Sequence, residues 1–585
     1  MLKFIVFSSL CGLASVQAQT VSLGGRVFST GGNAISGAAI SLISRQSSTT
    51  SDAGGNFSFS STAILPDRIS SGYSFELLRG GISISLARRV VSGHVELYGW
   101  NGKKEVSIPL DGMEKGVHNL AIPNLSPGFY MVRLSLDGNT YAHRLLRMEG
   151  GFLNAGSREV SAARSGAGPF AKTAVAIDTL LAVKAGFQDT KVPVGSLTKT
   201  NVQIVMTPVC TIPAMPAAAS LPSIAKLPDP FMSMSGSRVG TKAAWDCRRE
   251  EISRQFQAYE LGTMPPRPAS VTASLSGNSL TISVTDGGKT ISFAVTITKP
   301  TTGTAPYPVL IGYGSSSLSD VISLGVATLN YPNNTIANDG AGTSTDRGKG
   351  LFYTLYGSTH SAGSLMAWAW GVSRIIDALE LTPEAGLDPS RVAVTGCSRN
   401  GKGALVAGAF DPRIALTFPQ ESGSGGTDSW RVSDYMLDTL KQSTQTLTEL
   451  VTEEPWLSTV VNPFLSGKTR LLPFDHHMLV GMVAPRALVD FSNSDYLWLG
   501  ALSSFTNDSA AKRIYIALGA PEAMTYSEVG GHAHCSFPTG QKHWVDSYVR
   551  KYLLGGTGEA AKIENDQHFM FDENRWVNWT TPTLQ

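Results

Sequence analysis

The chain has 585 residues, a formal net charge of +2 and 16% charged residues. One hydrophobic core rarely organises a chain of this length, so we expect about three or four domains. The near-neutral charge balance gives no electrostatic reason to expect nucleic acid or a polyanionic surface as a partner.

The first eighteen residues are typical of a bacterial-type secretory signal peptide. Lys3 precedes an apolar run from Phe4 to Val16, and Val16-Gln17-Ala18 is an A-x-A-like cleavage site. Cys11 lacks the preceding small residue of a lipoprotein signal. No later window offers about 20 uninterrupted apolar residues. We therefore predict an exported, cleaved protein, extracellular or at the cell surface, with no membrane span.

Residues 19–208 are rich in Ser, Gly, Val and Thr, and their short alternating segments predict antiparallel β structure. Gly25-Arg26-Val27 and the turn before Phe57 resemble the first half of a carboxypeptidase-regulatory-like β-sandwich, whose closing strands resemble 180–206. We predict one split sandwich (19–74 plus 173–208), an inserted β-domain (75–149) and a Gly/Ser/Ala-rich return linker (150–172). Such modules are more often spacers than binders.

Beyond an Ala/Pro-rich segment at 213–222, apolar strand patterns alternate with helical ones. An apolar stripe predicts a helix over 364–381. This alternation predicts a parallel sheet, with any site at the C-terminal ends of its strands. The expected strands are 308–313, 325–329, 392–395, 414–419, 486–491 and 513–517.

The string Gly-Cys-Ser-Arg-Asn-Gly-Lys-Gly-Ala at 396–404 joins one of these strands to a small-residue helical stretch. A strand, a Gly-flanked serine and a helix are the parts of a nucleophile elbow, in which the turn exposes the serine hydroxyl. Here the second glycine comes one residue later than in G-x-S-x-G, and an ordinary strand–helix turn is the competing interpretation. We predict an α/β-hydrolase domain, a three-layer αβα sandwich, over 209–585, with Ser398 as nucleophile.

A serine nucleophile needs a histidine base and an orienting carboxylate, which α/β-hydrolases carry in the order Ser, acid, His. The loop 530–538 offers His532 and His534, which spacing alone does not separate. Glu421 follows the strand after the elbow helix, and Asp495 occupies the later and commoner position for the acid. The backbone N–H of Arg399, directly after the serine, is the expected oxyanion donor.

These motifs resemble the glucuronoyl esterases, carbohydrate esterase family 15, over about residues 210–585. The resemblance implies His534 as base and Glu421 as acid, with Asp495 as the rival used by some bacterial relatives. It adds the Arg399 guanidinium to the oxyanion hole. It also implies a uronate pocket whose residues bond the sugar hydroxyls or line its apolar face: Lys402, Gln445, Glu453 and Trp498.

Four cysteines remain after the predicted signal: Cys210, Cys247, Cys397 and Cys535. In an exported protein they predict two disulfides, with three possible pairings. The family resemblance implies a Cys397–Cys535 bond between the nucleophile turn and the histidine loop, which leaves Cys210 with Cys247.

The resemblance implies a serine esterase that cleaves the ester between 4-O-methyl-glucuronate of glucuronoxylan and lignin alcohols. We separately expect a monomer. An acetyl xylan or feruloyl-type esterase is the alternative, and a carbohydrate-binding or adhesion protein with an inactive hydrolase domain is another. No cofactor is expected. Asp475 with His476 and His477 does not complete a metal ligand set and is assigned a structural role. The segment 331–349 is a candidate mobile wall without an assigned role.

Overall fold

A computed structural model describes residues 19–43, 47–64, 73–78, 81–86, 89–99, 104–114, 116–121, 128–136, 139–148, 151–154, 178–314 and 318–585. The predicted signal peptide and most of the predicted linker lie outside these residues. None of the described helices is long and apolar enough to cross a membrane. The chain divides into two compact units, one containing Ala63–Phe170 and the other Thr20–Thr62 with Ala171–Gln585.

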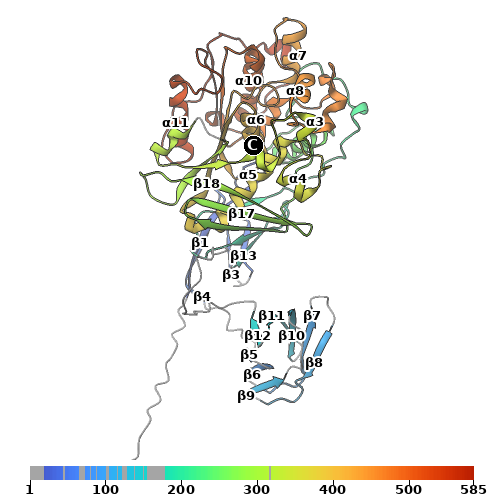
Figure 1. The fold of residues 1–585 in the computed structure, drawn as a ribbon, viewed down its shortest axis with the longest axis vertical. Helices are drawn as coiled ribbons and strands as arrows, with labels where there is room; N and C mark the ends of the chain where they lie inside the picture. The colour runs from blue at the N-terminus through green and yellow to red at the C-terminus, as the bar shows by residue number, and fades with distance from the viewer. Residues whose placement is uncertain are drawn as a thin grey trace, which may run out of the picture. The chain divides into compact units, whose positions relative to one another are not determined.

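The unit containing Ala63–Phe170 is built from antiparallel β structure in its described part (Figure 1). A three-stranded sheet has the order β5-β6-β9, and a five-stranded sheet has the order β12-β11-β10-β7-β8. Val95 and Leu97, two residues apart on one strand, are both fully buried, and Glu96 between them is 7% exposed. The strands are β5 Tyr73–Leu78, β6 Gly81–Leu86, β7 Gly93–Gly99, β8 Lys104–Pro109, β9 Gly116–Ala121, β10 Gly128–Leu136, β11 Asn139–Met148 and β12 Gly151–Asn154.

In the second unit, strands that begin before residue 63 and strands that begin after residue 177 share two further sheets, ordered β15-β1-β4 and β14-β13-β2-β3. β1 runs parallel to β15, and β2 runs antiparallel to β13. Val27, Ile40, Leu180 and Ile204 are fully buried, so both segments contribute to the packed interior. The strands are β1 Gln19–Ser29, β2 Ala39–Leu42, β3 Ser47–Thr50, β4 Asn56–Ile64, β13 Asp178–Val183, β14 Thr190–Val194 and β15 Val202–Met206.

The rest of the second unit is organised around a ten-stranded mixed sheet, ordered β16-β17-β18-β20-β19-β21-β22-β23-β24-β25. The pairs from β20–β19 to β24–β25 are parallel, as predicted, but β16 to β18 form an antiparallel meander that joins β20 antiparallel. The strands are β16 Ser270–Ser276, β17 Ser279–Asp286, β18 Lys289–Thr298, β19 Tyr307–Tyr313, β20 Ala327–Tyr331, β21 Leu387–Cys397, β22 Ile414–Gln420, β23 Ala487–Ser492, β24 Met524–Glu528 and β25 Ile563–Asn565.

Both faces of this sheet are covered, because successive residues of its strands enter two different hydrophobic cores. Val392 and Val394 of β21 pack in the larger core with α5, α6 and α10, whereas Ala393 packs in a smaller core with α11. Alternating side chains of one strand point to opposite faces, so helices lie on each side. The helices are α1 Lys242–Phe256, α2 Asn333–Ile336, α3 Thr343–Asp346, α4 Leu351–Tyr356, α5 Ser364–Leu381, α6 Arg399–Phe410, α7 Trp430–Asp438, α8 Leu447–Glu453, α9 His476–Gly481, α10 Ala501–Ala517, α11 Lys542–Tyr552 and α12 Glu573–Trp576.

The predicted helix over 364–381 coincides with α5, but the predicted strand over 513–517 is wrong. That segment is the end of α10, and the strand before the histidine loop is β24. Ile514 and Tyr515 are fully buried while Ile516 is 51% exposed. Burial of two adjacent residues followed by an exposed one has a helical period, because a half-buried strand would bury Ile514 and Ile516 together.

Candidate active site

Ser398 lies at a sharp turn between β21, which ends at Cys397, and α6, which begins at Arg399. Its backbone has φ 59° and ψ −128°, a combination that non-glycine residues rarely adopt. The turn is held because Ser398 N donates to Gln420 O (2.9 Å) and Lys402 N donates to Ser398 O (3.0 Å). Backbone strain of this kind persists only where the surrounding structure enforces it, as at functional sites.

The two glycines around the serine are required by close backbone approach. A Cβ added at Gly396 would lie 2.5 Å from Asn400 O, and one at Gly401 would lie 2.6 Å from Gln420 O. Neither neighbour is a flexible side chain, so neither contact can be relieved cheaply. The second glycine therefore stands where α6 crosses the end of β22.

Glu421 directly follows β22 and is 2% exposed. Its Oε2 lies 2.7 Å from His534 Nδ1, and the backbone N–H of Cys535 donates to both carboxylate oxygens at 3.1 Å. Gln420 and Asn493 donate their side-chain amides to Oε1 and Oε2, at 3.1 and 3.3 Å. The carboxylate thus accepts from several N–H groups and is bonded to one imidazole nitrogen.

These donors decide the charge of Glu421. Burial alone raises the pKa of a carboxyl group, but the hydrogen bonds from His534 and from the Cys535 backbone outweigh it. The pKa of Glu421 is therefore lowered below its ordinary 4.5. An ionised carboxylate orients the imidazole with its proton on Nδ1, which leaves Nε2 free to accept a proton.

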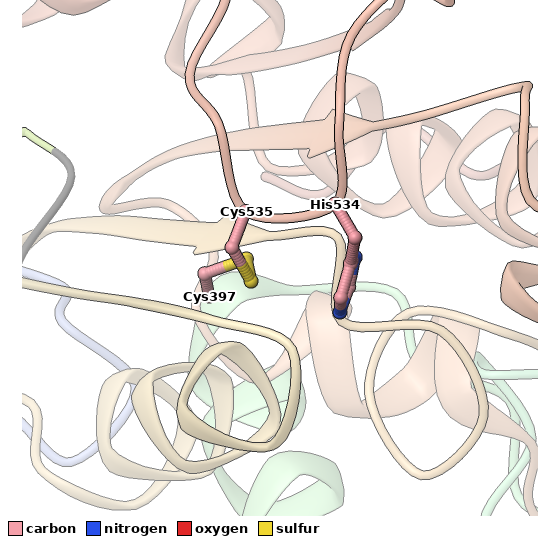
Figure 2. Close-up of side chains that lie close together, drawn as sticks. All are labelled: Cys397, His534 and Cys535. Atoms are coloured by element: carbon pink, nitrogen blue, oxygen red, sulfur yellow. A yellow bond between two sulfur atoms is a disulfide. The ribbon is translucent and has the colours of Figure 1, made fainter.

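A disulfide joins the two halves of the site (Figure 2). Cys397 and Cys535 are bonded at 2.04 Å with their Cα atoms 5.6 Å apart, and they directly adjoin Ser398 and His534. Their sulfurs and a His534 nitrogen lie within 4.8 Å of one another, but disulfide sulfurs offer no thiolate to a metal. The second predicted pair, Cys210–Cys247, is also bonded. Both disulfides have the pairing that the family resemblance implied.

The other sequence candidates for base and acid have different hydrogen-bond partners. Asp495 is exposed and accepts from the backbone N–H of Gly531 at 2.7 Å. His532 places Nε2 2.9 Å from the Val529 carbonyl, and its Nδ1 is 4.0 Å from Glu421 Oε1. Of the two predicted acids, Glu421 is the one that contacts the His534 ring.

The Arg399 guanidinium contacts Asp339 and the Trp456 ring. Nη1 lies 3.1 Å from Asp339 Oδ1, and the guanidinium carbon lies 5.3 Å from the centroid of the Trp456 ring. The side chain is 41% exposed, so the donors that do not face Asp339 are accessible from solvent. Its position directly after Ser398 places its backbone N–H beside the serine.

Lys402, one turn further along α6, is 5% exposed. Its Nζ donates to Ser422 O at 2.6 Å and lies 5.3 Å from the centroid of Trp456. Burial lowers the pKa of Lys402 to about 8, although the nearby carboxylates of Asp428 and Glu453 act in the opposite direction. Below pH 8 this lysine is a buried cation beside the Trp456 ring.

The three remaining predicted pocket residues lie toward the surface. Gln445 Nε2 donates to Glu453 Oε2 at 2.7 Å, so these two side chains form one polar pair. Trp498 is 43% exposed and packs edge-on against His534, with ring centroids 4.7 Å apart. The backbone N–H of Gln445 faces Trp498 O at 3.5 Å, which connects the pair to the tryptophan.

Sequence patterns assign no role to several residues around the site. Asp339 and Trp456 frame Arg399, and the Tyr496 hydroxyl accepts from His534 N at 2.9 Å. Asp339 belongs to the segment 331–349, which contains α2 and α3 and is joined by hydrogen bonds to the chain around α8. Its Asn- and Gly-rich composition predicted a loop, and nothing local to it indicated these distant partners.

A serine at a strand–helix turn, with a carboxylate–imidazole pair at the C-terminal edge of parallel strands, defines an α/β-hydrolase-like domain. The sequence profile described as "Glucuronyl esterase, fungi" matches residues 282–519. The 4-O-methyl-glucuronoyl methylesterase of Hypocrea jecorina is 50% identical over 377 residues, which cover 64% of this chain and 79% of that protein. The Schizophyllum commune protein of the same name is 48% identical over 63% of this chain and 94% of its own length.

Solved structures give the same result. The glucuronoyl esterase catalytic domain from Hypocrea jecorina is 49% identical with a TM-score of 0.60, over 63% of this chain and all of that one. A mutant glucuronoyl esterase from Sporotrichum thermophile, in complex with methyl 4-O-methyl-β-D-glucopyranuronate, is 42% identical with a TM-score of 0.61, over 64% and 100%. This chain therefore belongs to the glucuronoyl esterases.

Proposed function

We propose that this protein hydrolyses the ester between 4-O-methyl-glucuronate of glucuronoxylan and lignin alcohols, as a serine esterase that passes through an acyl-enzyme. The observation that carries the chemistry is the 2.7 Å bond between Glu421 and His534, on a loop joined by a disulfide to the residue before Ser398. The substrate class is supported by relatives named 4-O-methyl-glucuronoyl methylesterases and by the relative solved with a methyl glucuronate ester.

In this reaction Ser398 Oγ attacks the uronate carbonyl carbon while His534 Nε2 removes its proton. Glu421 keeps the other ring nitrogen protonated and stabilises the imidazolium that forms. The tetrahedral intermediate collapses, the ester C–O bond breaks, and His534 returns the proton to the departing alkoxide. Water, activated by the same histidine, then attacks the acyl-enzyme and releases glucuronate.

The negative charge of the tetrahedral intermediate forms next to the start of α6. The backbone N–H of Arg399 and the positive end of that helix stabilise it, and the accessible donors of the Arg399 guanidinium add a full charge. Because the substrate carbonyl is neutral and the intermediate is anionic, these groups bind the intermediate more tightly than the ester. That difference lowers the barrier.

The sugar is recognised on the acyl side of the ester. The Gln445–Glu453 pair and Lys402 supply donors and acceptors for hydroxyl groups, and Trp498 offers an aromatic face to the apolar side of a pyranose. An acetyl xylan or feruloyl-type esterase would place the sugar or the xylan on the alcohol side, where these groups would contribute nothing to the acyl pocket. This arrangement favours the uronate ester.

For the N-terminal region we propose that 19–74 with 173–208 is one split β-module, interrupted by a second one at 75–149. The pairing of β1 with β15 and of β2 with β13 supports this division. We assign the modules a spacer role in an exported, monomeric enzyme. Limited proteolysis that releases a stable fragment of about 75–149, without loss of the remaining chain, would support the division.

Hydrolysis of benzyl glucuronate, measured beside 4-nitrophenyl acetate for the native protein and Ser398→Ala, tests the function. We expect the uronate ester to be cleaved far faster than the acetate, with both activities lost in the variant. Cleavage of acetate alone would move the function to a general carbohydrate esterase. Absence of both activities would instead favour the binding or adhesion protein.

A further inference from the structure

Asp339 accepts hydrogen bonds from two residues that lie on separate parts of the chain. Its side chain is 3% exposed and belongs to the segment between α2 and α3. Oδ1 lies 3.1 Å from Arg399 Nη1, and Oδ2 accepts from the Trp456 indole N–H at 3.1 Å. Each carboxylate oxygen therefore bonds a different donor.

The Trp456 ring is in turn the surface against which both cations of the site pack. It is 3% exposed, and the Arg399 guanidinium carbon and Lys402 Nζ each lie 5.3 Å from its centroid. A desolvated aromatic face attracts such cations through its quadrupole. By holding the indole N–H, Asp339 also orients the ring that both cations contact.

The backbone around Asp339 is itself anchored. Its N–H donates to the Asn334 side chain, and Glu454 accepts from Gly342 N at 3.1 Å. The Arg347 guanidinium donates to Leu457 O at 3.1 Å. The last two bonds join the segment to the chain on either side of Trp456, so the Asp339 carboxylate is held in place by contacts other than its bond to Arg399.

Arg399 needs such a partner because its side chain is 41% exposed. A half-exposed arginine samples many rotamers, and ordering it only when the oxyanion forms would cost conformational entropy at that step. A bond from Nη1 to a buried carboxylate orders it beforehand and still leaves other N–H groups for the substrate. Preorganised donors are those that stabilise developing charge most effectively.

We propose that Asp339 is a positioning residue for the esterase reaction, which holds the Arg399 guanidinium and the Trp456 ring in place for the oxyanion. This inference rests on the proposed function, in which Arg399 stabilises the tetrahedral intermediate. Asp339 acts on catalysis through Arg399 and does not touch the substrate.

The test is a double-mutant cycle in the full chain on benzyl glucuronate. Asn at position 339 has the same shape but only one acceptor oxygen, so its amide group must face a donor of Arg399 or Trp456. Asp339→Asn is expected to lower kcat about 10- to 50-fold and to change KM less than about threefold. In an Arg399→Ala background the same substitution is expected to change kcat less than about twofold.

Asp346→Asn is the matched control, because this buried carboxylate of the same segment accepts from Ala341 N. It is expected to lower the melting temperature and leave kcat unchanged. Three results would each overturn the inference. Asp339→Asn could lower kcat equally in the native and the Arg399→Ala backgrounds, it could change KM alone, or it could keep the native kcat. An inactive native protein, or an active Ser398→Ala, would overturn the proposed function instead, so the two failures are distinguishable.

Discussion

Replacing Glu421 by Gln tests which carboxylate orients the base. The native carboxylate accepts from His534 at 2.7 Å, from Cys535 N at 3.1 Å and from the amides of Gln420 and Asn493. A glutamine offers one acceptor oxygen and an amide group, and every neighbour just named is a donor. In either orientation the amide group therefore faces a donor.

The magnitude follows from the tautomer of His534. If the new amide group donates to Nδ1, the imidazole carries its proton on Nε2 and cannot accept one from Ser398. An equivalent change in a serine protease lowers kcat about 10⁴-fold. We expect Glu421→Gln to lower kcat on benzyl glucuronate about 10³- to 10⁴-fold, which corresponds to about 4 to 5 kcal/mol in the barrier.

Asp495→Asn is the matched control. Asp495 is exposed and bonds the backbone N–H of Gly531, so we expect its kcat to fall less than about threefold. Both variants are assayed at equal folded concentration, verified by circular dichroism. A Glu421→Gln enzyme with more than a tenth of native kcat, or a larger loss from Asp495→Asn, would refute the assignment of the acid.

Three further predictions concern the walls of the site. Lys402→Met is expected to raise KM for the uronate ester about 10-fold and to raise the melting temperature at pH 7. Between pH 8 and 10.5 the unfolded chain binds a proton that the folded chain has lost, so native stability rises with pH and the variant's advantage disappears. Melting curves of both proteins from pH 7 to 10.5 check this. A difference in melting temperature between Lys402→Met and the native protein that stays constant with pH would contradict it. Trp498→Ala is expected to raise KM about 10-fold on benzyl glucuronate and little on 4-nitrophenyl acetate; equal effects on both would remove its sugar contact. Replacing Cys397 and Cys535 by Ser opens a loop of 138 residues and is expected to cost about 2–5 kcal/mol in the free energy of unfolding and most of kcat. Denaturant titration with activity assays measures both, and native kcat would show that the disulfide does not hold the histidine in place.

Local sequence patterns were enough to predict the elements whose buried residues repeat with a regular period along the chain. The helix at 364–381 was predicted because its apolar stripe repeats with a helical period, and the strand–serine–helix order at 396–404 needs only neighbouring residues. The same reasoning predicted the wrong element for 513–517, because an Ile-Tyr-Ile run is compatible with either a strand or a helix. The packing of α10 decides between them.

Which residues form the site is decided by contacts between residues that are far apart in the sequence. Sequence spacing left Glu421 and Asp495 both open as acids, and only the fold shows which of them reaches His534. Asp339 and Trp456 are 117 positions apart, and the sequence assigns neither of them a role. Their pairing exists because the segment between α2 and α3 packs beside the end of α8. A local pattern records the period of burial along one element, whereas a hydrogen bond between two elements is set only when the sheet and its loops bring them together.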